Sequence, residues 1–140
     1  MKIIVNIFII ILLIWTSWYD IKTYKIKNFV PLLIIAVAPF ANYLRLSERF
    51  MGLIICILPM IFVKKFIGGI GMGDIKLSAA FGFLLGTISG LTSLIICCIV
   101  LLVYFAIIKN IKKIKIKKLP MAPFLAIGFI ISLLINWRYL

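Results

Sequence analysis

Apolar residues fill most of the chain in six long runs, and short polar or glycine-rich segments separate these runs. The runs cover Ile3–Tyr19, Phe29–Leu44, Phe50–Val63, Phe66–Gly86, Leu91–Ile108 and Leu119–Trp137. A helix of about 20 residues crosses the roughly 30 Å hydrocarbon layer of a bilayer. The pattern therefore predicts an all-α integral membrane protein, a bundle of about six transmembrane helices in one domain that covers residues 1–140.

The composition supports the membrane class, because 66% of the residues are apolar and the mean hydropathy is +1.30, values too high for a soluble domain. The net charge of +13 comes from lysines that lie between the apolar runs, so we expect no nucleic-acid partner. The chain has no histidine, and Cys56, Cys97 and Cys98 lie inside apolar runs without CxxC spacing. We therefore expect no metal site and predict that the cysteines are buried as small apolar residues.

Lysines cluster after the first, third and fifth runs, in the segments Lys22–Lys27, Lys64–Lys65 and Lys109–Lys118. Short cytoplasmic loops are enriched in Lys and Arg, so these three connections should face the cytoplasm and both termini should lie outside. We expect the segment Lys109–Lys118 to set the topology and to rest on anionic headgroups. Glu48, between Arg45 and Arg49, should then lie in an outside loop as a solvated ion-pair partner.

The chain has three acidic residues, and two of them occupy informative places. Asp20 ends the first apolar run, and Asp74 lies in a glycine-rich stretch of the fourth. Two predicted spans separate them, so both should lie at the cytoplasmic boundary. Ionisable side chains near lipid are costly and are functional candidates by default. Two carboxylates that share a proton can act as acid and base in the hydrolysis of a peptide bond, so we expect a catalytic pair; alternatively, Asp74 merely caps a helix.

The depth of Asp74 follows from the length of chain beyond it. Only 32 residues separate Lys76 from Lys109, about 48 Å of helix, which is too short for two full crossings. We favour a fourth helix that begins near Phe66 and places Asp74 and Lys76 below the membrane surface, surrounded by protein or water. The alternative, a single crossing, would place Lys109–Lys118 outside.

Several neighbours of the two aspartates could shape the site. Four glycines precede Asp74 and leave room for a substrate backbone; they are Gly68, Gly69, Gly71 and Gly73. Lys76 either extends its amine toward the membrane surface or favours ionisation of Asp74. Pro123 should shape the entry to the last apolar run.

Three motifs resemble those of one family. WYDIKTYKIKN, which starts at Trp18 and ends at Asn28, GIGMGDIKLSAAFGFLLG around Asp74, and PMAPFLAIG around Pro123 occur in the order seen in the type IV prepilin peptidases, membrane aspartic proteases of the GxGD class. Lys27 stands where that family commonly has Pro before Asn28. The match covers nearly the whole chain.

The resemblance implies a six-helix membrane domain with Asp20 and Asp74 as the catalytic pair on the cytoplasmic side. The implied reaction removes the short basic leader from prepilin-like or pseudopilin precursors, in the cytoplasmic membrane of a bacterium or archaeon. It implies no metal or organic cofactor. The cysteine-bearing region that bifunctional members use for methylation has no counterpart here, so we expect a peptidase without N-methyltransferase activity.

Two other interpretations stay open from the residues alone. A proton-coupled transporter or channel could use the same two buried acids, although we find no internal repeat of the kind such proteins often have. A non-catalytic assembly subunit would tolerate loss of either aspartate. The motifs do not choose among substrates of competence, adhesion or secretion systems, and they carry no information on oligomeric state.

Overall fold

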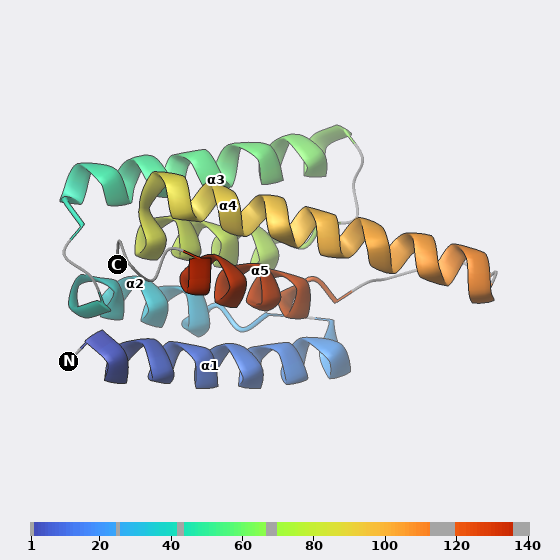
Figure 1. Ribbon diagram of the computed structural model, residues 1–140, viewed down its shortest axis with the longest axis horizontal. Coiled ribbons are helices and arrows are strands. Elements are labelled where there is room, and N and C mark those ends of the chain that lie inside the picture. Colours follow the sequence, from blue (N-terminus) through green and yellow to red (C-terminus); the bar gives the residue numbers. More distant parts are fainter. Residues whose placement is uncertain (1, 25, 42–43, 67–69, 113–119, 136–140) are drawn as a thin grey trace.

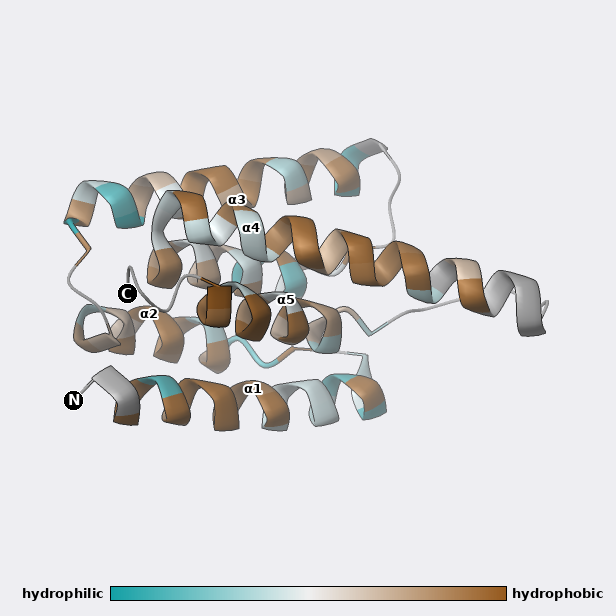
Figure 2. Ribbon diagram, in the orientation of Figure 1, coloured by the Kyte–Doolittle hydropathy of each residue, from teal (hydrophilic) through white to brown (hydrophobic). Residues whose placement is uncertain are grey.

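The protein is all-helical throughout the part that the computed structural model describes, residues 2–24, 26–41, 44–66, 70–112 and 120–135 (Figure 1). The helices are α1 (Lys2–Thr23), α2 (Phe29–Ala41), α3 (Leu46–Phe66), α4 (Met72–Lys112) and α5 (Ala122–Ile135). The predicted all-α class is confirmed. Apolar residues cover most of the ribbon, and polar segments gather mainly near helix ends (Figure 2), as expected for helices surrounded by lipid.

Helix α4 consists of two arms that run in opposite directions (Figure 1). Gly86 interrupts it with φ 78° and ψ −170°, a left-handed backbone that glycine adopts without a steric penalty. A Cβ atom added to Gly90 would lie 3.2 Å from the Cα atom of Gly82, whereas residues eight apart in a straight helix are about 12 Å apart. The chain therefore turns back at Gly86.

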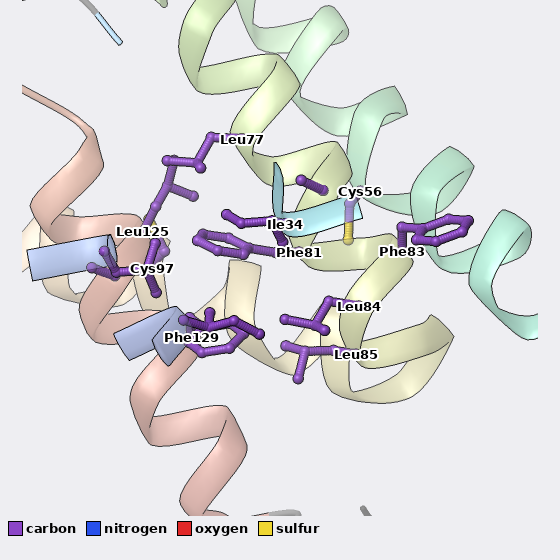
Figure 3. Close-up of a cluster of buried hydrophobic side chains, with 14 of the residues drawn as sticks. Ile34, Cys56, Leu77, Phe81, Phe83, Leu84, Leu85, Cys97, Leu125 and Phe129 are labelled. Carbon is purple, nitrogen blue, oxygen red and sulfur yellow. The ribbon is translucent and has the colours of Figure 1, made fainter. Parts of the chain in front are cut away.

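The two arms of α4 form the centre of the bundle, because α4 packs against α2, α3 and α5, while α1 packs against α2 and α5. Figure 3 shows the core side chains between these helices. The rings of Phe81 on the first arm and Phe129 on α5 stack with their centroids 4.9 Å apart, and both are buried. This core holds the first arm of α4, which carries Asp74, against α5.

Helices α3 and α4 approach so closely that their backbones touch at two glycines. A Cβ atom on Gly82 would overlap the carbonyl group of Gly52, and one on Gly52 would overlap the carbonyl group of Gly82. Small residues allow such close packing in membrane proteins, where van der Waals contact drives helix association. The first arm of α4 is thereby held on two sides, by α5 and by α3.

The prediction of about six transmembrane helices is met only in part. Five helices lie in the described ranges, and three are long and apolar enough to cross a membrane: α1, α3 and α4. The fourth predicted helix does not begin near Phe66, because α3 continues to that residue and α4 begins at Met72. Asp74 consequently lies in the first turn of a helix rather than in its interior.

Two smaller expectations were also wrong. Arg49 belongs to α3 rather than to an outside loop, and its side chain is only 3% exposed. The guanidinium lies over the ring of Phe83 and donates weak hydrogen bonds to the carbonyl oxygens of Leu44 and Phe83. Cys56 and Cys97 are buried as predicted, but Cys98 is exposed on α4.

Candidate active site

Asp20 lies in the last turn of α1, and its side chain is 4% exposed. Its Oδ2 atom accepts a hydrogen bond of 3.0 Å from the backbone N–H of Ala122, the first residue of α5. The first N–H groups of a helix have no partner within that helix, and the positive end of the helix dipole favours a negative charge. Asp20 therefore caps α5 from a different helix, which places the carboxyl group at the junction of α1 and α5.

Asp74 is the third residue of α4 and is 9% exposed. Its Oδ2 atom accepts the N–H of Gly71 at 3.1 Å, and the carbonyl oxygen of Gly71 accepts the N–H of Ile75. An acidic side chain that reaches back to the residue before its helix is one half of a capping box. Asp74 therefore caps α4, as the alternative interpretation of the sequence predicted.

Capping does not occupy the whole carboxyl group of Asp74. Its Oδ1 atom is buried and has no hydrogen-bond partner among the described residues. Leaving a buried acceptor without a partner costs about 1–3 kcal/mol, so a purely structural cap would gain from satisfying both oxygens. One oxygen of Asp74 is therefore held by Gly71, while the other is buried without a partner among the described residues.

Both aspartates lie at helix ends, Asp20 in the last turn of α1 and Asp74 in the first turn of α4. The C-terminal end of α1 and the N-terminal ends of α4 and α5 lie at the same end of the bundle (Figure 1). The fold thus brings together two acids that are 54 positions apart in the sequence, 74 − 20 = 54. Acid–base hydrolysis by two carboxyl groups would need them at the same end of the bundle, and whether they act in this way stays a prediction.

The connection between α1 and α2 covers the beginning of α4. Ile26 packs against Gly73 so closely that a Cβ atom on this glycine would lie 2.8 Å from the Cβ atom of Ile26. Asn28 accepts a hydrogen bond of 2.9 Å from the amine of Lys76. Two candidates from the sequence, Asn28 on the connection and Lys76 on α4, therefore pair with each other.

The remaining candidates fall nearby. Gly71 holds Asp74 through its N–H group. Pro123 lies in the first turn of α5, next to the residue that binds Asp20. Gly68 and Gly69 lie outside the described residues. Whether any of these residues takes part in chemistry stays a prediction.

Sequence reasoning missed the contribution of Ala122, whose backbone amide fixes Asp20. A backbone N–H is present in every residue except proline and leaves no mark in the sequence. It also missed the packing of Ile26 on Gly73. In the described ranges, no group of three His, Cys, Asp or Glu residues is placed to hold a metal ion.

Comparison with protein families places the chain in one of them. The model of the type IV leader peptidase family matches residues 7–108, a range of 102 residues out of 140 that includes both aspartates. Comparison with curated proteins and with solved structures gave no match. The resemblance seen in the sequence motifs is thereby confirmed. This all-helical, multi-pass membrane protein belongs to the type IV leader peptidase family.

Proposed function

We propose that the protein is an aspartic endopeptidase that removes the short basic leader of prepilin-like precursors, with Asp20 and Asp74 as the catalytic pair. The observation that carries the proposal is the buried Oδ1 atom of Asp74, which has no hydrogen-bond partner among the described residues. It lies in the first turn of α4, at the end of the bundle where the helix of Asp20 also ends (Figure 1). Membership of a peptidase family supports the reaction type. The same membership favours hydrolysis over proton-coupled transport.

The chemistry needs one ionised and one protonated carboxyl group. The ionised group removes a proton from water as the water attacks the scissile carbonyl carbon, and the protonated group donates to the carbonyl oxygen. Hydrogen bonds from Ala122 and Gly71 each hold one oxygen of a carboxyl group, and we assign the other oxygen of each carboxyl group to the reactants. When the tetrahedral intermediate collapses, the proton that the base took up passes to the leaving amine, and the other carboxyl group regains its proton from a hydroxyl of the intermediate. The pair thereby returns to its starting state.

The lengths of the α4 arms support a site near the membrane boundary. The first arm, residues 72–85, has 14 residues, about 21 Å of helix, which is less than the roughly 30 Å hydrocarbon layer. The second arm, residues 87–112, has 26 residues, about 39 Å, and extends beyond the other helices (Figure 1). If the turn at Gly86 lies near one surface, Asp74 lies below the opposite one, within the protein.

The proposed orientation places the site on the cytoplasmic side of a bacterial or archaeal cytoplasmic membrane. The segment Lys109–Lys118 begins at the end of the long α4 arm and continues into residues that the structure does not describe. Its charge favours anionic headgroups rather than the basic leader of the substrate. Neutralising these lysines should therefore disturb insertion more than turnover, and normal insertion with lost cleavage would contradict this assignment.

The test is co-expression with a candidate prepilin, whose loss of the leader is followed by gel mobility. Asp20→Asn and Asp74→Asn keep the shape of the side chain, and each should lower cleavage by at least about a hundredfold, because general acid–base catalysis contributes about 10²–10⁴-fold. Glu48→Gln is the matched control, because this third acid is exposed at the start of α3, at the other end of the bundle (Figure 1).

Processing that survives either aspartate substitution would disprove the catalytic pair. Partial activity in one variant is not expected, since two groups that act as a unit do not contribute additively. Mass analysis of the mature N-terminus tests the prediction of a peptidase without methyltransferase activity, which expects an unmethylated amine. Proton flux that depends on the aspartates in vesicles, without cleavage, would instead favour the transporter.

A further inference from the structure

The connection between α1 and α2 contacts both helices that carry the aspartates. We propose that Lys27 is a positioning residue: it clamps this connection onto α1 and so keeps Asp20 and Asp74 at their working separation. This inference rests on the proposed function for its kinetic consequence. Its structural consequence can be measured without any peptidase activity.

The first half of the clamp is a contact between Lys27 and the aromatic face of α1. The amine of Lys27 lies 5.2 Å from the ring centroid of Trp15 and 4.7 Å from that of Tyr19, within the distance of about 6 Å at which a cation is attracted to a ring face. The two rings stack with centroids 5.9 Å apart. They are four residues apart on one helix face, and Tyr19 precedes Asp20. The cation is thus fixed over the helix turn that leads to the first aspartate.

The second half of the clamp is made by the neighbours of Lys27. Ile26 packs against Gly73, and Asn28 accepts the hydrogen bond from Lys76. Gly73 and Lys76 lie on either side of Asp74 in the sequence. The second aspartate is therefore flanked by residues that hold the connection.

Three consecutive residues thus reach two helices alternately: Ile26 and Asn28 contact α4, and Lys27 contacts α1. Without the amine of Lys27, the connection would lose its hold on the aromatic face of α1 and would also contact α4 less persistently, because both sets of contacts fix the same three residues. The distance between the two helices would then be less well determined at the site.

A different role for Lys27, attraction of lipid headgroups, predicts a different pattern of mutational effects. Lys22 is also exposed, and its amine lies 4.9 Å from the ring centroid of Trp18. Both Lys22 and Trp18 belong to α1, so this second cation–ring contact holds no loop. Lys22→Met removes the same charge and the same type of contact as Lys27→Met, and it is the matched control for headgroup and charge effects.

The kinetic experiment measures cleavage of a prepilin peptide in vesicles by the native chain and by Lys27→Met, Lys27→Arg and Lys22→Met. A cation–ring contact at an exposed site corresponds to about a two- to fivefold effect, so loss of both contacts should lower kcat on the order of tenfold with little change in KM. Lys27→Arg keeps a cation over the rings and should keep most of the activity. Lys22→Met should behave like the native chain.

A double-mutant cycle tests the partners of Lys27. The variant Trp15→Leu/Tyr19→Leu should show a loss similar to that of Lys27→Met, and adding Lys27→Met to it should lower kcat little further. Effects that simply multiply would mean that the amine and the rings act independently, which would overturn the clamp. This cycle also keeps the proposal testable if Lys27→Met alone inserts poorly.

The structural experiment uses disulfide cross-linking of Asn28→Cys with Lys76→Cys, in a chain whose three native cysteines are replaced by alanine. These two side chains are in contact in the structure. Lys27→Met should slow the cross-link and Lys22→Met should not, whether or not the chain cleaves anything. Equal effects of the two lysine substitutions, or a native rate with Lys27→Met, would overturn the inference. Failure of the native chain to cleave would affect only the proposed function.

Discussion

The contact between Gly52 and Gly82 determines how closely α3 and α4 can approach, and Gly82→Ala perturbs it directly. The added Cβ atom would overlap the carbonyl oxygen of Gly52 and lie 2.7 Å from its carbonyl carbon. Ordinary van der Waals contacts begin near 3.4 Å, so the backbones must separate by at least 0.7 Å, 3.4 − 2.7 = 0.7. Because both partners are backbone atoms within helices, no side-chain rotation relieves the overlap.

Overpacking of this kind costs about 1–3 kcal/mol. At roughly 2–4 °C per kcal/mol for a chain of this size, Tm should fall by about 2–12 °C. The measurement is thermal unfolding in detergent, followed by the intrinsic fluorescence of the tryptophans. A native Tm for Gly82→Ala would refute the reasoning, because it would mean that the two backbones are not in contact.

Gly90→Ala is a comparison in which the atom nearest to the added Cβ belongs to a side chain, whereas for Gly82→Ala it belongs to the backbone. Its Cβ atom would lie 3.0 Å from the sulfur of Cys56 and 3.2 Å from the Cα atom of Gly82. Removal of the sulfur by Cys56→Ala should therefore rescue a larger part of the Tm loss caused by Gly90→Ala. The same rescue should be smaller for Gly82→Ala, whose Cβ atom would lie 2.8 Å from that sulfur but would also overlap the carbonyl group of Gly52, which stays in place.

Three further substitutions test other contacts by the same unfolding measurement. Arg49→Lys should lower stability by about 1–3 kcal/mol, because a single amine cannot reproduce the planar fork that contacts two carbonyl oxygens and the ring of Phe83; native stability would argue against these contacts. Tyr24 has φ 51°, so Tyr24→Gly should be more stable than Tyr24→Ala by about 1 kcal/mol, and the reverse order would contradict a left-handed backbone there. Ser132→Ala removes the 2.7 Å hydrogen bond to the carbonyl oxygen of Ser89 and should cost about 0.6–1.7 kcal/mol, the range for interhelical hydrogen bonds in a membrane; a loss well above this range would require another role.

The two aspartates stand out as candidates in the sequence, because acids are rare in this chain and costly near lipid. The position of Asp74 within its helix, by contrast, could not be predicted from the sequence. The apolar run that contains it continues back to Phe66, and hydrophobicity alone does not mark where α3 ends and α4 begins. The boundary depends on the cap that Asp74 makes with Gly71, a local hydrogen bond that competes with other backbone choices.

The burial of Arg49 could not be predicted from the sequence either. Beside Arg45 and Glu48 it looks like part of a solvated loop, yet its guanidinium is buried at the last turn of the first α4 arm. Carbonyl groups at a helix C-terminus have no partner within the helix and attract cations. The arm ends there only because the chain turns back at Gly86, so the partner of Arg49 exists only in the folded protein.

The sequence alone determined that this chain is an all-helical membrane protein, that Asp20 and Asp74 are its two conspicuous acids, and that its motifs are those of a leader peptidase family. These properties follow from hydrophobicity and residue type, which each position carries independently of the fold. The tertiary structure decided which backbone amides hold the two carboxyl groups, and that the connection from α1 to α2 contacts both of their helices. The contacts of Asp20 with Ala122 and of Asn28 with Lys76 join residues 102 and 48 positions apart, and such partners are specified only when the helices pack.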